Sequence, residues 1–145
     1  MKIKSPAFEH NKMIPARFTC QGSGINPALE IGGIPPDAKS LVLIMDDPDA
    51  PSGTFLHWLV YDIPITINIP EDSVPGKQGL NTTMGSDYVP PCPPSGTHRY
   101  FFKLFALDKD LGLKDGADLK TVEKAMSGHV LDKAELIGLY KKQST

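Results

Sequence analysis

Prolines divide this chain into short apolar runs, and that pattern limits its possible folds more than any other feature. The chain has 14 prolines in 145 residues, about twice the usual ~5%. Proline fixes φ and removes an N–H donor, so it interrupts helices and inner strands. Short apolar runs between turn-forming clusters are typical of an all-β sandwich or barrel. The expected strands are Ile3–Ala7, Arg17–Cys20, Ala28–Ile31, Ser40–Met45, Leu56–Ile63, Arg99–Leu107 and Leu131–Tyr140.

One helix is expected over Leu119–Ser127, because its apolar side chains recur at helical spacing. Asp118 can cap its start, and Gly128 suits the left-handed residue after its end. The segment after it favours a strand, with a helix as the alternative. No linker, repeat or charge block divides the chain, so we expect a single domain over residues 1–145.

Charge and hydropathy narrow the class of protein. The formal net charge of −2 gives no electrostatic reason to expect nucleic-acid binding. No apolar run reaches the ~18 residues of a membrane span. The N-terminus lacks an apolar signal core, so we expect a cytoplasmic protein. Cys20 and Cys92 fit free thiols in a reducing compartment, and a pairing between them stays open.

Two carboxylates stand beside prolines where a buried strand ends. The segment reads Asp47-Pro48-Asp49-Ala50-Pro51. Proline also restricts the residue before it to extended conformations, so both carboxylates are held rigidly. Such aspartates often accept backbone N–H bonds in a turn. The alternative is that at least one of them faces a ligand cavity.

Two histidines occur on different expected strands. His57 and His98 are 41 positions apart, so only the fold can bring them together. A proline-rich segment, Pro90–Pro94, leads into the strand that His98 opens. Alternation along that strand places His98 and Tyr100 on one face and Arg99 on the other. Taken alone, each histidine is more typical of a packed or surface residue than of a ligand contact.

Four stretches together resemble the phosphatidylethanolamine-binding protein family, also called the Raf kinase inhibitor-like family. They are DPDAP at 47–51, HWLVYDIP at 57–64, GKQGLNTTMGSDY at 76–88 and CPPSGTHRYFF at 92–102. The resemblance covers residues 5–142, and within the family the chain is similar to the short bacterial and archaeal branch. It implies a β-sandwich of two antiparallel sheets with one or two short helices. It also implies a pocket lined by Asp47, Pro51, His57, Cys92, Pro93, Pro94, His98 and Tyr100, with Asp49 bracing the loop.

The resemblance implies a binding protein rather than an enzyme, with no cofactor and no metal. Imidazole and hydroxyl donors in a shielded pocket suit a phosphate or phosphoester group, such as a phospholipid headgroup. The family further implies a protein kinase or other signalling partner, and a homodimer as in bacterial relatives. One departure is Pro90, which stands where the family has glycine. Because proline cannot adopt positive φ, we expect a stiffer pocket entrance.

The alternative function is enzymatic. Asp47, His57 and His98 would form a two-histidine, one-carboxylate metal site, or Cys92 and His98 would form a nucleophile pair in a hydrolase-like enzyme. The HExxH, CxxC and GxSxG motifs are all missing from the sequence, which disfavours this reading.

Three further expectations concern the site's geometry and pH response. Dense proline predicts at least one cis X-Pro bond within 47–51 or 90–94. His98 is expected at the pocket rim, outside the core. Phosphate binding is expected to be tighter near roughly pH 6 than near roughly pH 8, because a protonated His57 or His98 donates two hydrogen bonds.

Overall fold

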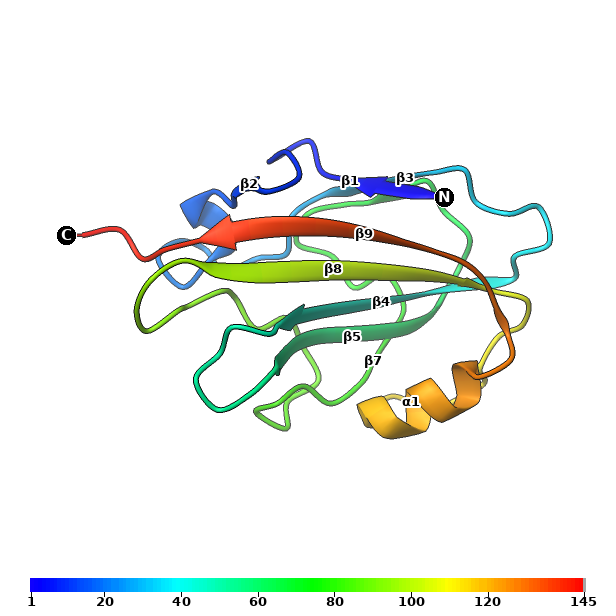
Figure 1. The fold of residues 1–145 in the computed structure, drawn as a ribbon. Coiled ribbons are helices and arrows are strands. Elements are labelled where there is room, and N and C mark those ends of the chain that lie inside the picture. The colour runs from blue at the N-terminus through cyan, green and yellow to red at the C-terminus, as the bar shows by residue number, and fades with distance from the viewer. Residues whose placement is uncertain (145) are drawn as a thin grey trace.

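The computed structural model describes residues 1–144 and shows two β-sheets packed face to face, with one short α-helix (Figure 1). The smaller sheet has the strand order β1-β3-β6 and the larger has β2-β9-β8-β4-β5-β7. The strands are β1 Lys2–Lys4, β2 Lys12–Met13, β3 Leu29–Gly32, β4 Ser40–Asp47, β5 Phe55–Ile63, β6 Asn68–Ile69, β7 Lys77–Gln78, β8 His98–Leu107 and β9 Val130–Tyr140. The α-helix α1 covers Leu119–Met126, and a 3₁₀-helix covers Ala16–Phe18.

The expected β-sandwich is confirmed. Every strand pair is antiparallel except β2 with β9, which is a parallel pair of two residues at the sheet edge. The strand alternative for the last segment is also confirmed, because β9 pairs with β8 along almost its whole length. The four long strands β4, β5, β8 and β9 form the framework that positions the site (Figure 1).

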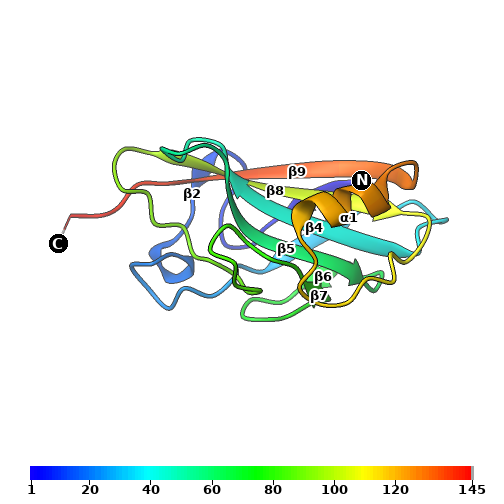
Figure 2. The same ribbon diagram turned by 90° about the horizontal axis from the view of Figure 1, so that it is seen from below.

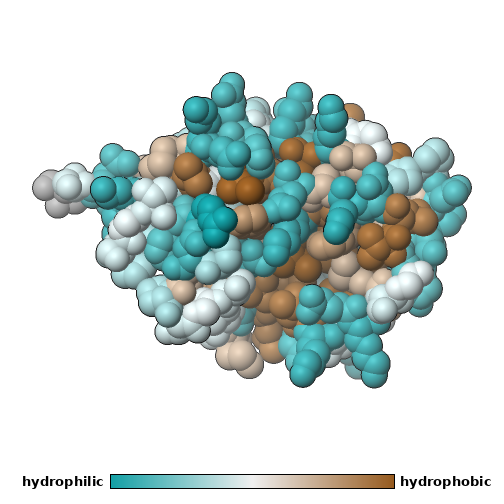
Figure 3. Space-filling model, in the orientation of Figure 1, coloured by the Kyte–Doolittle hydropathy of each residue, from teal (hydrophilic) through white to brown (hydrophobic). Residues whose placement is uncertain are grey.

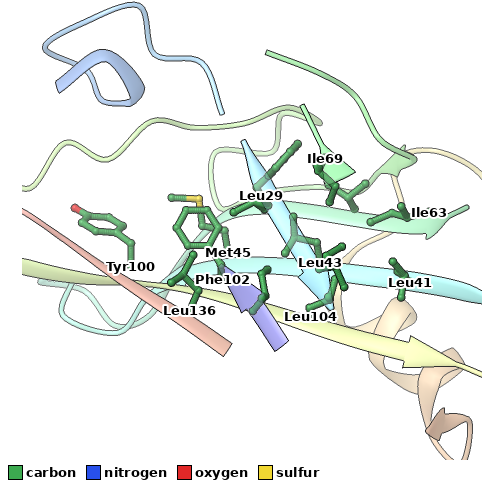
Figure 4. Packing of buried hydrophobic residues seen from close by; sticks show 14 of the residues in the cluster. Leu29, Leu41, Leu43, Met45, Ile63, Ile69, Tyr100, Phe102, Leu104 and Leu136 are labelled. Carbon is green, nitrogen blue, oxygen red and sulfur yellow. The ribbon is translucent and has the colours of Figure 1, made fainter. Parts of the chain in front are cut away.

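The main core lies between the two sheets. Side chains of a strand alternate between its faces, so Leu41, Leu43 and Met45 of β4 all point into this core. Figure 4 shows a row of packed apolar side chains in which Tyr100 lies at one end, away from Leu41 and Ile63. The site described below begins at the Tyr100 end.

The other face of β4 is apolar as well, because α1 covers part of the large sheet. Val42 and Ile44 pack with Val122 and Met126 of the helix in a second cluster. Figures 1 and 2 show α1 beside the end of the sheet where β9 begins. Away from the helix, this side of the molecule leaves hydrophobic residues exposed between hydrophilic ones (Figure 3).

The helix caps follow the sequence. The Asp118 carboxylate accepts a hydrogen bond from the Thr121 N–H at 2.8 Å, and Gly128 has a φ of 81°. An N-cap acceptor satisfies one of the unpaired N–H groups of the first turn. A left-handed glycine then lets the chain leave the helix toward β9. Both expected capping residues are thereby confirmed, and the helix ends at Met126, one residue before the expected Ser127.

Two expected strands differ from the structure. Arg17–Cys20 is not a strand, because the chain after Pro15 turns into the 3₁₀-helix and the Thr19 hydroxyl donates to the Ala16 carbonyl at 2.8 Å. The Ile3–Ala7 strand ends early, at Lys4. There the Ser5 hydroxyl accepts the Ala7 N–H at 3.1 Å. In both places a hydroxyl side chain competes with sheet pairing for backbone groups.

Candidate functional site

A cavity of about 220 Å³ opens at one end of the large sheet. Its walls come from the end of β4 and the loop after it, from the starts of β5 and β8, and from the proline-rich segment before β8. The lining residues are Asp47, Ala50, Pro51, Phe55, His57, Val89, Pro90, Cys92, Pro93, Pro94, His98 and Tyr100. The structure therefore brings together all eight residues that were predicted from the sequence to line a pocket. Their role as ligand contacts stays a prediction.

Four further residues line the cavity: Ala50, Phe55, Val89 and Pro90. Each lies within one of the family-like motifs or within two positions of one, so sequence adjacency was the available signal. Pro90 packs close to Gly24, where an added Cβ would meet the proline ring at 3.3 Å. The φ of Gly24 is 70°, a conformation that favours glycine. The stiff segment is thus supported from behind by a distant loop.

A β-bulge places His57 in the cavity. Met45 pairs with Trp58 and Asp46 pairs with Leu56, so His57 is the extra residue in β5. A bulge breaks strict alternation and re-aims a side chain. His57 and Trp58 consequently lie on the same side of the sheet, with Trp58 in the core and His57 lining the cavity.

Neighbouring groups fix the orientation of the His57 ring. Its Nδ1 lies 2.7 Å from the Val89 carbonyl oxygen, and the Val89 N–H donates to the His57 carbonyl at 3.0 Å. The rings of Phe55 and Tyr100 lie 4.6 Å and 5.3 Å from the imidazole centroid. Burial lowers the pKa of His57 below its ordinary value. The imidazole is therefore biased toward its neutral form.

His98 and Asp47 form a buried pair. His98 Nδ1 lies 2.7 Å from Asp47 Oδ2, and the two residues are only 7% and 3% exposed. The other carboxylate oxygen, Oδ1, accepts the Asp49 N–H at 2.8 Å. The expectation that His98 lies at the rim is therefore wrong. Pairing with a carboxylate at the end of β4 draws the ring into the interior, a contact that strand patterning does not reveal.

Tyr100 closes the floor of the cavity beside these groups. Its ring stacks on that of His98 with 6.5 Å between centroids. Burial, reinforced by the negative charge of Asp47, raises the pKa of Tyr100 well above its ordinary value. Tyr100 therefore keeps its hydroxyl proton and can serve as a hydrogen-bond donor.

Asp49 braces the loop, as the sequence predicted. Its Oδ2 accepts hydrogen bonds from the Arg99 backbone N–H at 2.9 Å and from Arg99 Nε at 3.0 Å, and its Oδ1 accepts from Nη2 at 2.9 Å. The Arg99 guanidinium holds the pKa of Asp49 below its usual range. Arg99 lies on the strand face opposite His98 and is exposed. This ion pair ties the loop after β4 to the start of β8 without entering the cavity.

The two cysteines are joined in a disulfide, so the free-thiol expectation is wrong. Both are exposed, and Cys92 borders the cavity. The Cys20 N–H also donates to the Pro91 carbonyl at 3.1 Å. With 72 positions between the cysteines, only the fold could show their proximity. The cysteines consequently no longer support a cytoplasmic location, because disulfides are typical of oxidising compartments.

Several other expectations can be compared with residues 1–144. Every peptide bond there is trans, so the expected cis X-Pro bond is wrong. Cys92 has no thiol to act as a nucleophile beside His98, because it is in the disulfide. The same residues contain no group of three or more His, Cys, Asp and Glu side chains placed to hold a metal ion. No helix among them is long and apolar enough to cross a membrane.

The chain is similar in sequence to known proteins along almost its full length. The model of the family described as phosphatidylethanolamine-binding protein matches residues 4–141. A UPF0098 protein of Methanothermobacter thermautotrophicus is 47% identical over 150 residues, covering 98% of this chain and 99% of the relative. A UPF0098 protein of Aquifex aeolicus is 49% identical over 152 residues, covering 98% and 89%.

Two solved structures share the fold. The phosphatidylethanolamine-binding protein homolog CT736 of Chlamydia trachomatis superposes with a TM-score of 0.95 at 41% identity, covering 98% of this chain and 97% of the other. Escherichia coli YbcL, described as a member of the mammalian PEBP family, has a TM-score of 0.88 at 24% identity and covers 98% of both chains. At that identity YbcL shows the fold alone.

Proposed function

Because the chain belongs to the phosphatidylethanolamine-binding protein family, we propose that it is a non-catalytic binding protein for a small phosphate or phosphoester group, of the kind found in a phospholipid headgroup. The observation that carries this proposal is the convergence of His57, His98 and Tyr100 in one cavity. All three bear hydrogen-bonding atoms, and they come from two strands that are distant in sequence.

The size and lining of the cavity support a small ligand. Pockets for drug-sized molecules span about 300–1,000 Å³, whereas this cavity has about 220 Å³. Proline, phenylalanine, alanine and valine make up seven of its twelve lining residues, so the polar atoms lie among apolar side chains. In a shielded site, hydrogen bonds to an anion are stronger than in water. A compact phosphate-bearing group suits this environment better than a lipid's acyl chains.

The family resemblance supplies the remaining parts of the proposal. A protein kinase or another signalling partner, a homodimer and a cytoplasmic location stay predictions. The enzymatic alternative through Asp47, His57 and His98 gains no support from the cavity, because His98 and Asp47 are already bonded to each other and Cys92 is oxidised.

Titration calorimetry with phosphoethanolamine and with ethanolamine tests the proposal. Phosphoethanolamine should bind and ethanolamine should not, because the phosphate is the group recognised. Tyr100→Phe should weaken binding about tenfold, the effect of one hydrogen bond to a charged group. Tyr61→Phe is the matched control, since the Tyr61 hydroxyl donates to the Lys114 carbonyl on the other side of the sheet. Equal binding of the two ligands would refute phosphate recognition.

A further inference from the structure

The hydrogen bond to Val89 decides which atom His57 offers to a ligand. A carbonyl oxygen can only accept, so His57 Nδ1, at 2.7 Å from that oxygen, carries a proton. Neutral imidazole has a single N–H. Nε2 is then the only polar ring atom left for a ligand, and it carries a lone pair. His57 is therefore a hydrogen-bond acceptor in the cavity, the opposite of what a bare anion requires.

His98 is oriented by the same logic but can change its role. An ionised carboxylate also only accepts, so His98 Nδ1 donates to Asp47. Nε2 of His98 is left for a ligand, as a donor when the ring is doubly protonated and as an acceptor when it is neutral. The two histidines can thus present one acceptor and one donor together.

The charges around His57 do not favour a doubly charged ligand. The ionisable groups that line the cavity with it are Asp47 at the end of β4, and His98 and Tyr100 on β8, whereas the nearby Asp46 pairs with Lys103 outside the cavity. The segment packed against its other side is proline, valine and the disulfide, none of which ionises. Among the residues described, no lysine or arginine lines the cavity. A dianion would therefore meet a carboxylate and at most one positive imidazole.

Resting on the proposed function, we propose that the cavity selects a phosphomonoester in its singly charged form, with the ligand's own P–OH donating to His57 Nε2. The unprotonated phosphate oxygens accept from His98 and Tyr100. A phosphodiester, such as a phospholipid headgroup, carries one charge but has no P–OH. In a bound phosphodiester, an oxygen without a proton would face His57 Nε2, so two hydrogen-bond acceptors would oppose each other. A free phosphomonoester, rather than the lipid, is then the preferred ligand.

Three small probes separate these possibilities. Methyl phosphate at low pH has one charge and a P–OH. Methyl sulfate has the same shape and charge but no proton. Dimethyl phosphate stands for the lipid phosphodiester. At roughly pH 5.5, methyl phosphate should bind at least about tenfold more tightly than either of the others, which is the effect of one hydrogen bond to a charged partner.

The pH dependence adds a second criterion. A phosphomonoester loses its second proton near pH ~6, so its advantage over methyl sulfate should disappear as the pH rises to roughly 8. A pH effect that the protein exerts equally on both probes cancels in the ratio of their affinities. If methyl sulfate or dimethyl phosphate binds as tightly as methyl phosphate at every pH, the inference is wrong but the proposed function stands. If none of the three binds, the proposed function itself is wrong.

His57→Phe tests the residue directly. Phenylalanine keeps a ring between Phe55 and Tyr100 but has no Nε2, so methyl phosphate should bind within about threefold of methyl sulfate. Because the variant also loses the bond to Val89, its folding is checked by thermal unfolding. The ¹⁵N NMR spectrum of His57 in the unmodified protein gives an independent result. A neutral ring protonated on Nδ1 at pH 7 is expected, and a ring protonated on Nε2 would overturn the inference.

Discussion

Breaking the Cys20–Cys92 disulfide should strongly destabilise the fold. The bond closes a loop of 72 positions. In the chain-entropy model, cross-linking a loop of that length raises the free energy of unfolding by about 4.4 kcal/mol at 25 °C. For a chain of this size, each kcal/mol corresponds to about 3 °C in Tm, so reduction should lower Tm by about 13 °C. Both cysteines are exposed, so a reducing agent can reach the bond without prior unfolding.

Urea unfolding, followed by far-UV circular dichroism with and without dithiothreitol, measures this loss. The double variant Cys20→Ser/Cys92→Ser is the matched control. It should unfold at the same urea concentration as the reduced protein, and dithiothreitol should not change that midpoint. A second effect is expected at the cavity, since Cys92 borders it and the bond ties the proline-rich segment to the 3₁₀-helix region. If reduction changes the free energy of unfolding by less than about 1 kcal/mol, the entropic argument does not hold for this fold.

Three further substitutions test the site and the sheet. His98→Ala should lower the free energy of unfolding by about 3–5 kcal/mol in urea titrations, because it leaves the Asp47 charge buried without its partner; a loss under about 1 kcal/mol would mean that water reaches the carboxylate. The lowered pKa of His57 means that the unfolded chain binds more protons below pH ~6.5, so stability should fall as the pH drops from there. His57→Phe should flatten that slope between roughly pH 6.5 and 5, and an unchanged slope would assign it to other groups. Gly138→Ala should cost about 1–3 kcal/mol by overpacking, because the new Cβ would lie 2.5 Å from a side-chain carbon of Ile14. Gly32→Ala, with no atom within 4 Å of the added Cβ, is the control, and equal losses in Tm would contradict the packing argument.

The elements that local physical chemistry specifies were predictable from the sequence. The strands β4 and β5 are mainly apolar runs with proline or glycine near their ends, and the residues that cap α1 at both ends can be identified in the sequence. Family resemblance added the sandwich and the eight nominated residues. Its motifs are stretches of neighbouring residues, so they indicate which side chains belong together without giving distances.

Where side chains compete with the sheet for backbone groups, the sequence was misleading. The apolar residues around Phe18 suggested a strand, but Pro15 and Thr19 support a 3₁₀-helix instead. The energy differences between such short elements are small, so contacts from elsewhere in the chain decide between them.

The chemical character of the site was decided by tertiary structure alone. His57 enters the cavity because of a bulge, and its acceptor atom depends on the Val89 carbonyl 32 positions away. His98 lies inside because Asp47 lies opposite it, and the state of Cys92 depends on Cys20. Residue types limit what each side chain can donate, accept or bond. Which of those options it uses depends on partners far along the chain, and only the folded structure brings them within hydrogen-bonding or bonding distance.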